Sequence, residues 1–150
     1  MSERGLTVLL VAALDRRVLP ALTLVPMLSG ADALALHIAV DRVASWQLGR
    51  DWMELGVTWL PLHIEEPTSP GVVESVHDFV AREVSVRPWV TVVVPEMDLG
   101  RWWQPLVHRA TGRSVAWALH DLPRVTTVVV PARIDLNAAV VLPRVAAGDG

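Results

Sequence analysis

Five apolar-rich runs divide the chain, and polar or loop-forming residues follow each of them. Continuous apolar stretches of this length are typical of parallel strands that helices cover on both faces. The sequence therefore predicts five strands, at residues 6–14, 33–40, 57–64, 89–94 and 125–130.

Between the first three apolar runs lie two segments whose residue pattern predicts helices. Residues 18–28 predict a helix in which Pro20 lies near the start, where its missing N–H costs little, and Pro26 ends or kinks the helix. Asp41 is a candidate N-cap for a second helix that ends at Gly56. We expect this helix to carry four residues on one side: Trp46, Gly49, Trp52 and Met53.

Two further helical segments follow. Ser69-Pro70 is a predicted helix start, and the buried face of that helix is expected at Val73, Val76, Val80 and Val84, opposite Glu74, Asp78 and Arg82. The segment from Arg101 to His120 predicts a long helix kinked at Thr111-Gly112. We expect Trp103 to face the core and Trp102 to be more accessible, with a second apolar face at Val115, Ala118, Leu119 and Leu122.

Strands that alternate with helices predict an α/β fold, an open parallel five-stranded sheet with helices on both faces. We expect the strand order 3-2-1-4-5, with Leu9 and Val93 on neighbouring central strands because their runs are the most continuously apolar. Pro61 places the third strand at an edge, since proline cannot donate to a ladder. Residues 1–134 form the domain, and 135–150 are a tail that either reaches a partner subunit or is disordered.

Composition narrows the possible functions. The chain has 150 residues, 16 acidic and 13 basic side chains and a net charge of -3, which argues against nucleic-acid binding. It contains no Cys, and every basic residue is Arg, so it has no thiol nucleophile, disulfide, Walker A lysine or Schiff-base lysine. The first run is far shorter than the about 20 residues that span a bilayer, and the start lacks signal-peptide charge bias. We therefore expect a cytoplasmic domain.

Candidate binding residues cluster where the sheet should reverse its strand order, because ligands bind there at the carboxyl ends of the strands. Asp15 follows the first strand, and Glu96 and Asp98 follow the fourth. These carboxylates could hold a magnesium ion, a ribose hydroxyl or a proton, or they could cap helices and face water.

Positive charge and backbone groups border the same predicted crevice. Arg16, Arg17 and Arg101 could pair with phosphate, or they could be solvated helix-start residues. We expect a bound nucleotide to place its phosphates near these arginines and the backbone around Gly100, and its base near Val40 and Asp41.

Catalytic motifs are incomplete. Gly112-Arg-Ser-Val-Ala116 lacks the second glycine and the preceding strand of a nucleophile elbow. His37 and His63 lie within strand patterns and are expected to be satisfied buried or surface histidines rather than metal ligands. We therefore predict no enzyme, no cofactor and no metal, and a hydrolase using Asp15, Glu96 or Asp98 is the least favoured alternative.

Two resemblances follow from short stretches. Ala13-Leu14-Asp15, Leu36-His-Ile-Ala-Val40 and the long helix after the fourth strand resemble the universal stress protein fold, a relative of flavodoxin-like sandwiches that binds adenine nucleotides. Val94-Pro-Glu96, Arg101-Trp-Trp103, Leu106-Val-His108 and Thr111 resemble the carboxy-terminal cytoplasmic domain of bacterial APC-superfamily permeases, including potassium importers. The second resemblance runs from about Thr7 to Ile134.

These resemblances imply a regulatory, dimerising module, and such potassium importers are associated with inhibition by cyclic di-AMP. The phosphate loop of universal stress proteins, Gly-x2-Gly-x9-Gly-Ser/Thr, is not carried over. Its positions here are Leu99, Trp102, Gly112 and Arg113, and only one of the four matches.

Two main hypotheses remain. The chain is either a transporter regulatory domain that senses an adenine nucleotide or a ligand-free dimerisation module. For both we expect a homodimer through the fifth strand, at Val125, Val128 and Val130, because this terminal strand has no charge or proline to discourage pairing.

Overall fold

A single sheet of five parallel strands forms the centre of the molecule. The computed structural model describes residues 4–15, 18–28, 32–68, 71–95 and 112–131. The strands are β1 (Leu6–Leu10), β2 (Asp32–Ile38), β3 (Leu62–Glu65), β4 (Val90–Pro95) and β5 (Val125–Val130). They are arranged in the order β3-β2-β1-β4-β5. This confirms the predicted strand order, and Leu9 and Val93 are register partners on adjacent strands.

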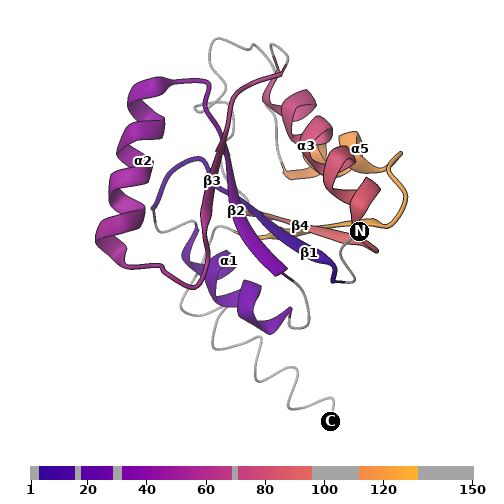
Figure 1. The fold of residues 1–150 in the computed structure, drawn as a ribbon, viewed down its shortest axis with the longest axis horizontal. Coiled ribbons are helices and arrows are strands. Elements are labelled where there is room, and N and C mark those ends of the chain that lie inside the picture. The colour runs from indigo at the N-terminus through magenta and orange to yellow at the C-terminus, as the bar shows by residue number, and fades with distance from the viewer. Residues whose placement is uncertain (1–3, 16–17, 29–31, 69–70, 96–111, 132–150) are drawn as a thin grey trace.

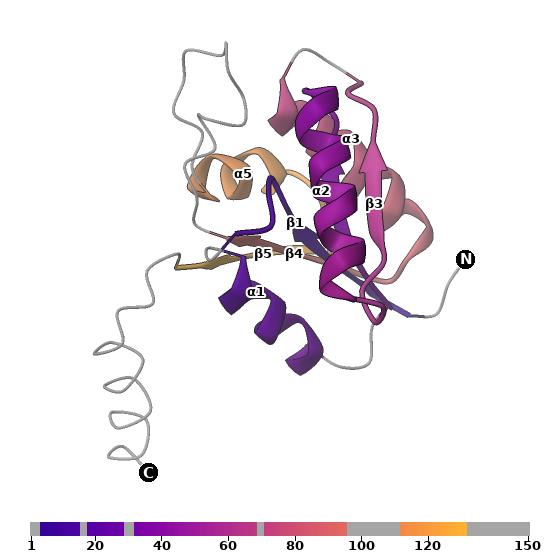
Figure 2. The same cartoon turned by 90° about the vertical axis from the view of Figure 1, so that its left-hand side faces the viewer.

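Helices cover both faces of this sheet, as predicted. They are α1 (Leu19–Leu24), which continues into the 3-10 helix η1 (Val25–Met27), α2 (Arg42–Leu55), α3 (Val72–Val86) and α5 (Gly112–Leu119). Figures 1 and 2 show α3 and α5 on one side of the sheet and α1 and α2 on the other.

The side chains of β1 alternate between two hydrophobic clusters, one on each face of the sheet. Leu6, Val8 and Leu10 pack with residues of α3 and α5. Leu9 packs on the opposite face with residues of α1 and α2. A strand that buries every residue in this way needs the continuous apolar run that the sequence carries.

The ends of α2 follow the sequence signals. The Asp41 carboxylate caps the helix by accepting hydrogen bonds from the N–H groups of Val43 at 2.9 Å and Ala44 at 3.2 Å. Gly56 ends it with a φ of 70°, a left-handed conformation that glycine adopts at little cost.

The side of α2 that faces the core differs from the prediction. Trp52 is buried together with Ser45 and Leu48, whereas Trp46 and Met53 are exposed. At about 100° per residue, position 52 points away from positions 46 and 53, so Trp52 does not share their side of the helix.

Other boundaries also shift. β1 ends at Leu10 rather than at residue 14. β3 is confined to 62–65, and Pro61 directly before it has no N–H to donate, although its carbonyl accepts from Ala35 of β2 at 2.8 Å. β3 is confirmed as an edge strand. The helix predicted after Ser69-Pro70 begins at Val72 with Gly71 as its N-cap. Trp102, Trp103 and the tail 135–150 lie outside the described residues.

Candidate functional site

The carboxyl ends of β1, β2 and β4 lie along one edge of the parallel sheet, and the strand order reverses between β1 and β4. β1 pairs with β2 on one side and with β4 on the other. Beyond the last register pair, Leu10 and Leu36, the N–H of Val11 still donates to the Leu36 carbonyl at 2.9 Å. The connection after β1 and the connection after β2 therefore start from the same edge, where open α/β sheets bind ligands.

His37 links the chain at this edge of the sheet to α2. Its Nδ1 lies 2.8 Å from the Val11 carbonyl oxygen, and its Nε2 lies 2.9 Å from the Ser45 hydroxyl of α2. Because a carbonyl oxygen only accepts, Nδ1 donates to Val11, and in the neutral ring Nε2 accepts from Ser45. The ring thus connects the end of β1 to the first turns of α2.

The histidine is fully buried, and burial lowers its pKa more than the hydrogen bond to Val11 raises it. The expectation of a satisfied buried histidine is confirmed. Its role in positioning the edge was missed, because the pairing of His37 with Ser45 depends on where α2 packs on the sheet.

Three of the predicted site residues lie within the described part of the chain. Val40 is exposed and lies shortly after β2, which ends at Ile38, and Asp41 beside it uses Oδ1 to cap α2. Asp15 is exposed in the connection between β1 and α1. The other predicted ligand contacts lie outside the described residues: Arg16, Arg17, Glu96, Asp98, Gly100 and Arg101.

Asp15 lines a hollow between the β1–α1 connection and the second half of α2. The hollow has a volume of about 490 Å³. Its walls are three leucines and three carboxylates: Leu14, Asp15, Leu19, Asp51, Glu54 and Leu55. Such a lining offers apolar contact and hydrogen-bond acceptors, but no positive charge for an anion.

The carboxylates of α2 in this hollow already have partners within the helix. Asp51 accepts a hydrogen bond from Gln47 at 2.8 Å, and Glu54 accepts one from Arg50 at 3.2 Å. Among the described residues, no group of three or more His, Asp or Glu side chains is placed to hold a metal ion.

A separate charged cluster joins β3 to α3. Glu65 accepts hydrogen bonds from Arg82 at 2.8 Å and from His63 at 2.6 Å. Burial pushes the pKa of Glu65 upward, but the hydrogen bonds from Arg82 and His63 outweigh it and hold that pKa below its usual value. The cluster lies on the outer side of α3 and fastens the edge strand to the helix.

The strand order, the parallel register and the helices on both faces define an open, doubly wound α/β domain. The chain belongs to the family of KimA potassium transporter C-terminal domains, which it matches over residues 2–132. The resemblance to the carboxy-terminal domains of APC-type permeases is thereby confirmed, and the chain is a transporter-associated domain. No curated protein matches it. Within the described ranges, none of the helices has the length and apolar composition required to cross a bilayer.

Proposed function

We propose that this chain is a regulatory domain at the cytosolic face of a KimA-type potassium transporter and that it senses an adenine nucleotide. The observation that carries the proposal is the reversal of strand order between β1 and β4. The carboxyl ends of β1 and β4 flank this reversal, and the connection after β2 leaves from the same edge of the parallel sheet beside the exposed Val40. The domain is proposed to act by binding rather than by catalysis.

The chemistry of the edge supports a nucleotide in two parts. The hollow beside Asp15 is open to solvent, and its leucines and carboxylates suit a nucleoside, whose hydroxyl and amino groups donate. Arg16 and Arg17, which follow Asp15 in the sequence, are our candidates for the fixed positive charge that phosphate requires. Cyclic di-AMP is our first candidate, because the chain belongs to a potassium transporter family and such importers are associated with inhibition by this nucleotide.

A thermal-shift screen with ATP, AMP and cyclic di-AMP tests the proposal. A ligand at 100 times its dissociation constant should stabilise the domain by about 2.7 kcal/mol. Calorimetric titration of the double variant Arg16→Ala/Arg17→Ala should then show a loss of affinity. Arg4→Ala/Arg82→Ala is the matched control, since it removes the same charge from two exposed arginines that do not line the hollow. Equal affinity in both double variants would move the phosphate site elsewhere, and the absence of a shift with any nucleotide would contradict the proposal.

A ligand-free dimerisation module is the second candidate, and the position of β5 favours it. β5 is the terminal strand of the sheet and carries no charged residue. Val125 packs toward the α3 and α5 side and Val130 toward the α1 and α2 side, so the backbone edge of the strand is the surface that a partner strand would pair with.

Light scattering tests this second candidate. We expect a dimer at micromolar concentration and a monomer for Val128→Lys, which places a charge in the edge strand. A monomeric wild type, or a dimeric Val128→Lys variant, would exclude pairing through β5.

A further inference from the structure

The outward side of α2 presents an apolar stripe to solvent. Val43, Trp46 and Met53 are exposed by 76%, 61% and 83%. The core contacts of the helix come from Ser45, Leu48 and Trp52 on its other side. Exposed tryptophan and methionine on one helix side are typical of contact surfaces, because these residue types are enriched in interfaces.

The stripe has the spacing of a helix–helix contact. Positions 43, 46, 50 and 53 follow the alternating three- and four-residue steps that place residues along one seam of a coiled coil. Arg50 completes the seam, and its guanidinium carbon lies 5.0 Å from the centre of the Trp46 ring. The seam is therefore apolar at both ends and carries a cation beside an aromatic ring in the middle.

This pattern is self-complementary in one orientation only. When two copies of α2 run antiparallel, Val43 lies in one layer with Met53 of the second copy, and Trp46 lies in one layer with Arg50 of the second copy. When they run parallel, Arg50 faces Arg50, and like charges repel. We infer that α2 is a docking surface for a second copy of this chain, with the two helices antiparallel.

Gly49 supports close approach of the second helix. It lies in the middle of α2 beside the seam, and a Cβ added there would meet nothing within 4 Å. Packing among the described residues therefore does not require glycine at this position, although glycine destabilises a helix interior by about 1 kcal/mol relative to alanine. A missing side chain next to the seam leaves room for the opposing backbone.

The charges of α2 favour a protein partner over a lipid surface. Helices that lie on anionic membranes carry an excess of Lys and Arg on their polar face. On α2 the arginines Arg42 and Arg50 are balanced by Asp51 and Glu54. A second copy of the helix has the same balance and therefore no net repulsion.

The contact is small, so it must be measured by a method that detects weak association. A 14-residue helix is about 21 Å long, so one helix pair buries less than the about 1,200 Å² of a stable interface. Free chains should associate weakly. Domains attached to the subunits of one transporter would meet at effective concentrations on the order of millimolar, where a weak contact is populated. The inference does not depend on nucleotide binding.

Disulfide trapping tests the register directly, because the chain contains no cysteine. Val43→Cys and Met53→Cys chains are mixed, oxidised and separated by mass. Random pairing of an equimolar mixture gives about twice as much mixed dimer as each homodimer; we expect a mixed dimer well above this ratio, since positions 43 and 53 share a layer. Like positions would lie about 15 Å apart along the axis, beyond the roughly 7 Å Cα separation that a disulfide allows.

Three comparisons make the outcome decisive. Trp46→Ala in both chains should lower the mixed-dimer yield by about tenfold, as for loss of a central aromatic anchor. Trp117→Ala, which removes a tryptophan that is 73% exposed on α5, should leave the yield unchanged. Val128→Lys should also leave it unchanged, which separates this contact from pairing through β5.

Val86→Cys on the exposed side of α3 measures random collision when it is mixed with Met53→Cys. A mixed dimer of positions 43 and 53 that is no more abundant than this background would overturn the inference. A mixed dimer no more than about twice as abundant as each homodimer, the ratio of random pairing, would also overturn it. So would stripe-dependent binding to anionic vesicles without disulfide trapping, which would assign the stripe to a lipid surface.

Discussion

The helices α2 and α3 have 14 and 15 residues, yet they attach to the sheet in different ways. α3 buries a broad side in the core: Val72, Ser75, Val76, Phe79, Val80 and Val84. α2 buries only Ser45, Leu48 and Trp52, and two of these three make hydrogen bonds, Ser45 with His37 and Trp52 with the Leu60 carbonyl at 3.0 Å. α3 is held by valine packing, and α2 is held by a few polar anchors and one tryptophan.

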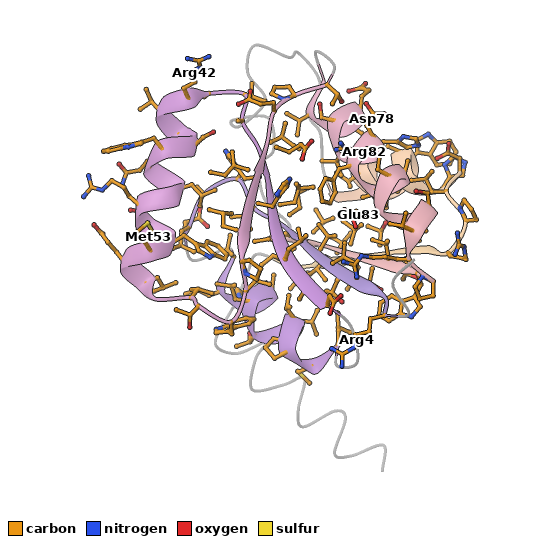
Figure 3. The ribbon with its side chains drawn as sticks, viewed as in Figure 1. Arg4, Arg42, Met53, Asp78, Arg82 and Glu83 are labelled. Atoms are coloured by element: carbon orange, nitrogen blue, oxygen red, sulfur yellow. The ribbon has the colours of Figure 1, made fainter. Side chains whose placement is uncertain are left out.

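The solvent-facing sides of α2 and α3 also differ: that of α3 is bonded within the chain, whereas that of α2 is exposed. The outer residues of α3 are bonded within the chain, with Asp78 accepting from the Thr68 hydroxyl at 2.6 Å and Arg82 donating to Glu65. The outer side of α2 exposes Val43, Trp46 and Met53. Figure 3 shows Arg42 and Met53 near the two ends of α2 and Asp78, Arg82 and Glu83 along α3. The outer side of α3 is complete in the monomer, whereas the outer side of α2 offers a surface to a partner.

Two tryptophans on α2 give the largest expected contrast. Trp52 is 5% exposed and donates to Leu60, so Trp52→Ala should lower the free energy of unfolding by about 3–5 kcal/mol. Trp46→Ala should change it by less than about 0.5 kcal/mol in the monomer. Urea denaturation followed by circular dichroism measures both. Similar losses in the two variants would show that the stripe is part of the core.

His37 tests how far α2 relies on polar anchors. At pH 8, His37→Gln should cost about 1–3 kcal/mol, because it disturbs buried partners at Val11 and Ser45. The folded-state pKa lies below the usual 6.5, so the unfolded chain binds the proton more readily. The stabilisation is therefore complete above about pH 6.5 and is lost as pH falls through the lowered pKa.

Urea denaturation between pH 8 and pH 5 should show the gap between wild type and His37→Gln narrowing as pH falls. The lowered carboxyl pKa values of Glu65 and Asp32 start from 4.5 and 3.8, so these groups titrate below that window. A gap that stays constant from pH 8 to pH 5 would show that the buried ring does not resist protonation.

Gly49 and Gly56 offer a smaller contrast at the middle and the end of α2. Gly49→Ala should stabilise the chain by about 0.5–1 kcal/mol, because alanine favours the helix and meets open space. Gly56→Ala should destabilise it by about 1–2 kcal/mol, since its φ of 70° is left-handed. Thermal unfolding at low protein concentration compares them. Destabilisation by Gly49→Ala would mean that packing within the chain requires the glycine.

Removing the ion pair on the outer side of α3 should have the smallest effect on the free energy of unfolding. Arg82 is 59% exposed, so Arg82→Ala should cost about 0.2–1 kcal/mol and less in high salt. Arg50→Ala, which removes a comparable pair with Glu54 at 3.2 Å, is the matched control. A loss above about 2 kcal/mol for Arg82→Ala alone would indicate that Glu65 becomes an unpaired buried charge.

The strand order could be predicted because central strands are buried on both faces and must be mainly apolar, as β1 is apart from the buried Thr7. The caps of α2 could be predicted because Asp41 and Gly56 act through local backbone geometry. The core side of α2 could not, because a helix with tryptophans on two sides has no single apolar face until the sheet beneath it is placed.

The sequence indicates the edge of the sheet where the candidate site lies, but not the contacts that form it. Val40 and Asp41 lie shortly after the end of β2, as predicted from the carboxyl edge of the sheet, whereas Asp15 lies in the connection to α1, well beyond the end of β1 at Leu10. The hollow beside Asp15 was missed, because half of its lining comes from α2. The link from His37 to Ser45 was missed for the same reason, since contacts between a strand and a packed helix leave no local sequence signal.

Backbone amide NMR of the chain during titration with cyclic di-AMP tests the central claim most directly. The account predicts saturable shifts at residues 11–15, at Val40 and Asp41, and at the α2 residues that line the hollow, Asp51, Glu54 and Leu55. It predicts no shifts in α3, because α3 covers the opposite face of the sheet. Shifts confined to α3, or no shifts at millimolar ligand, would contradict a nucleotide site at the ends of β1 and β2.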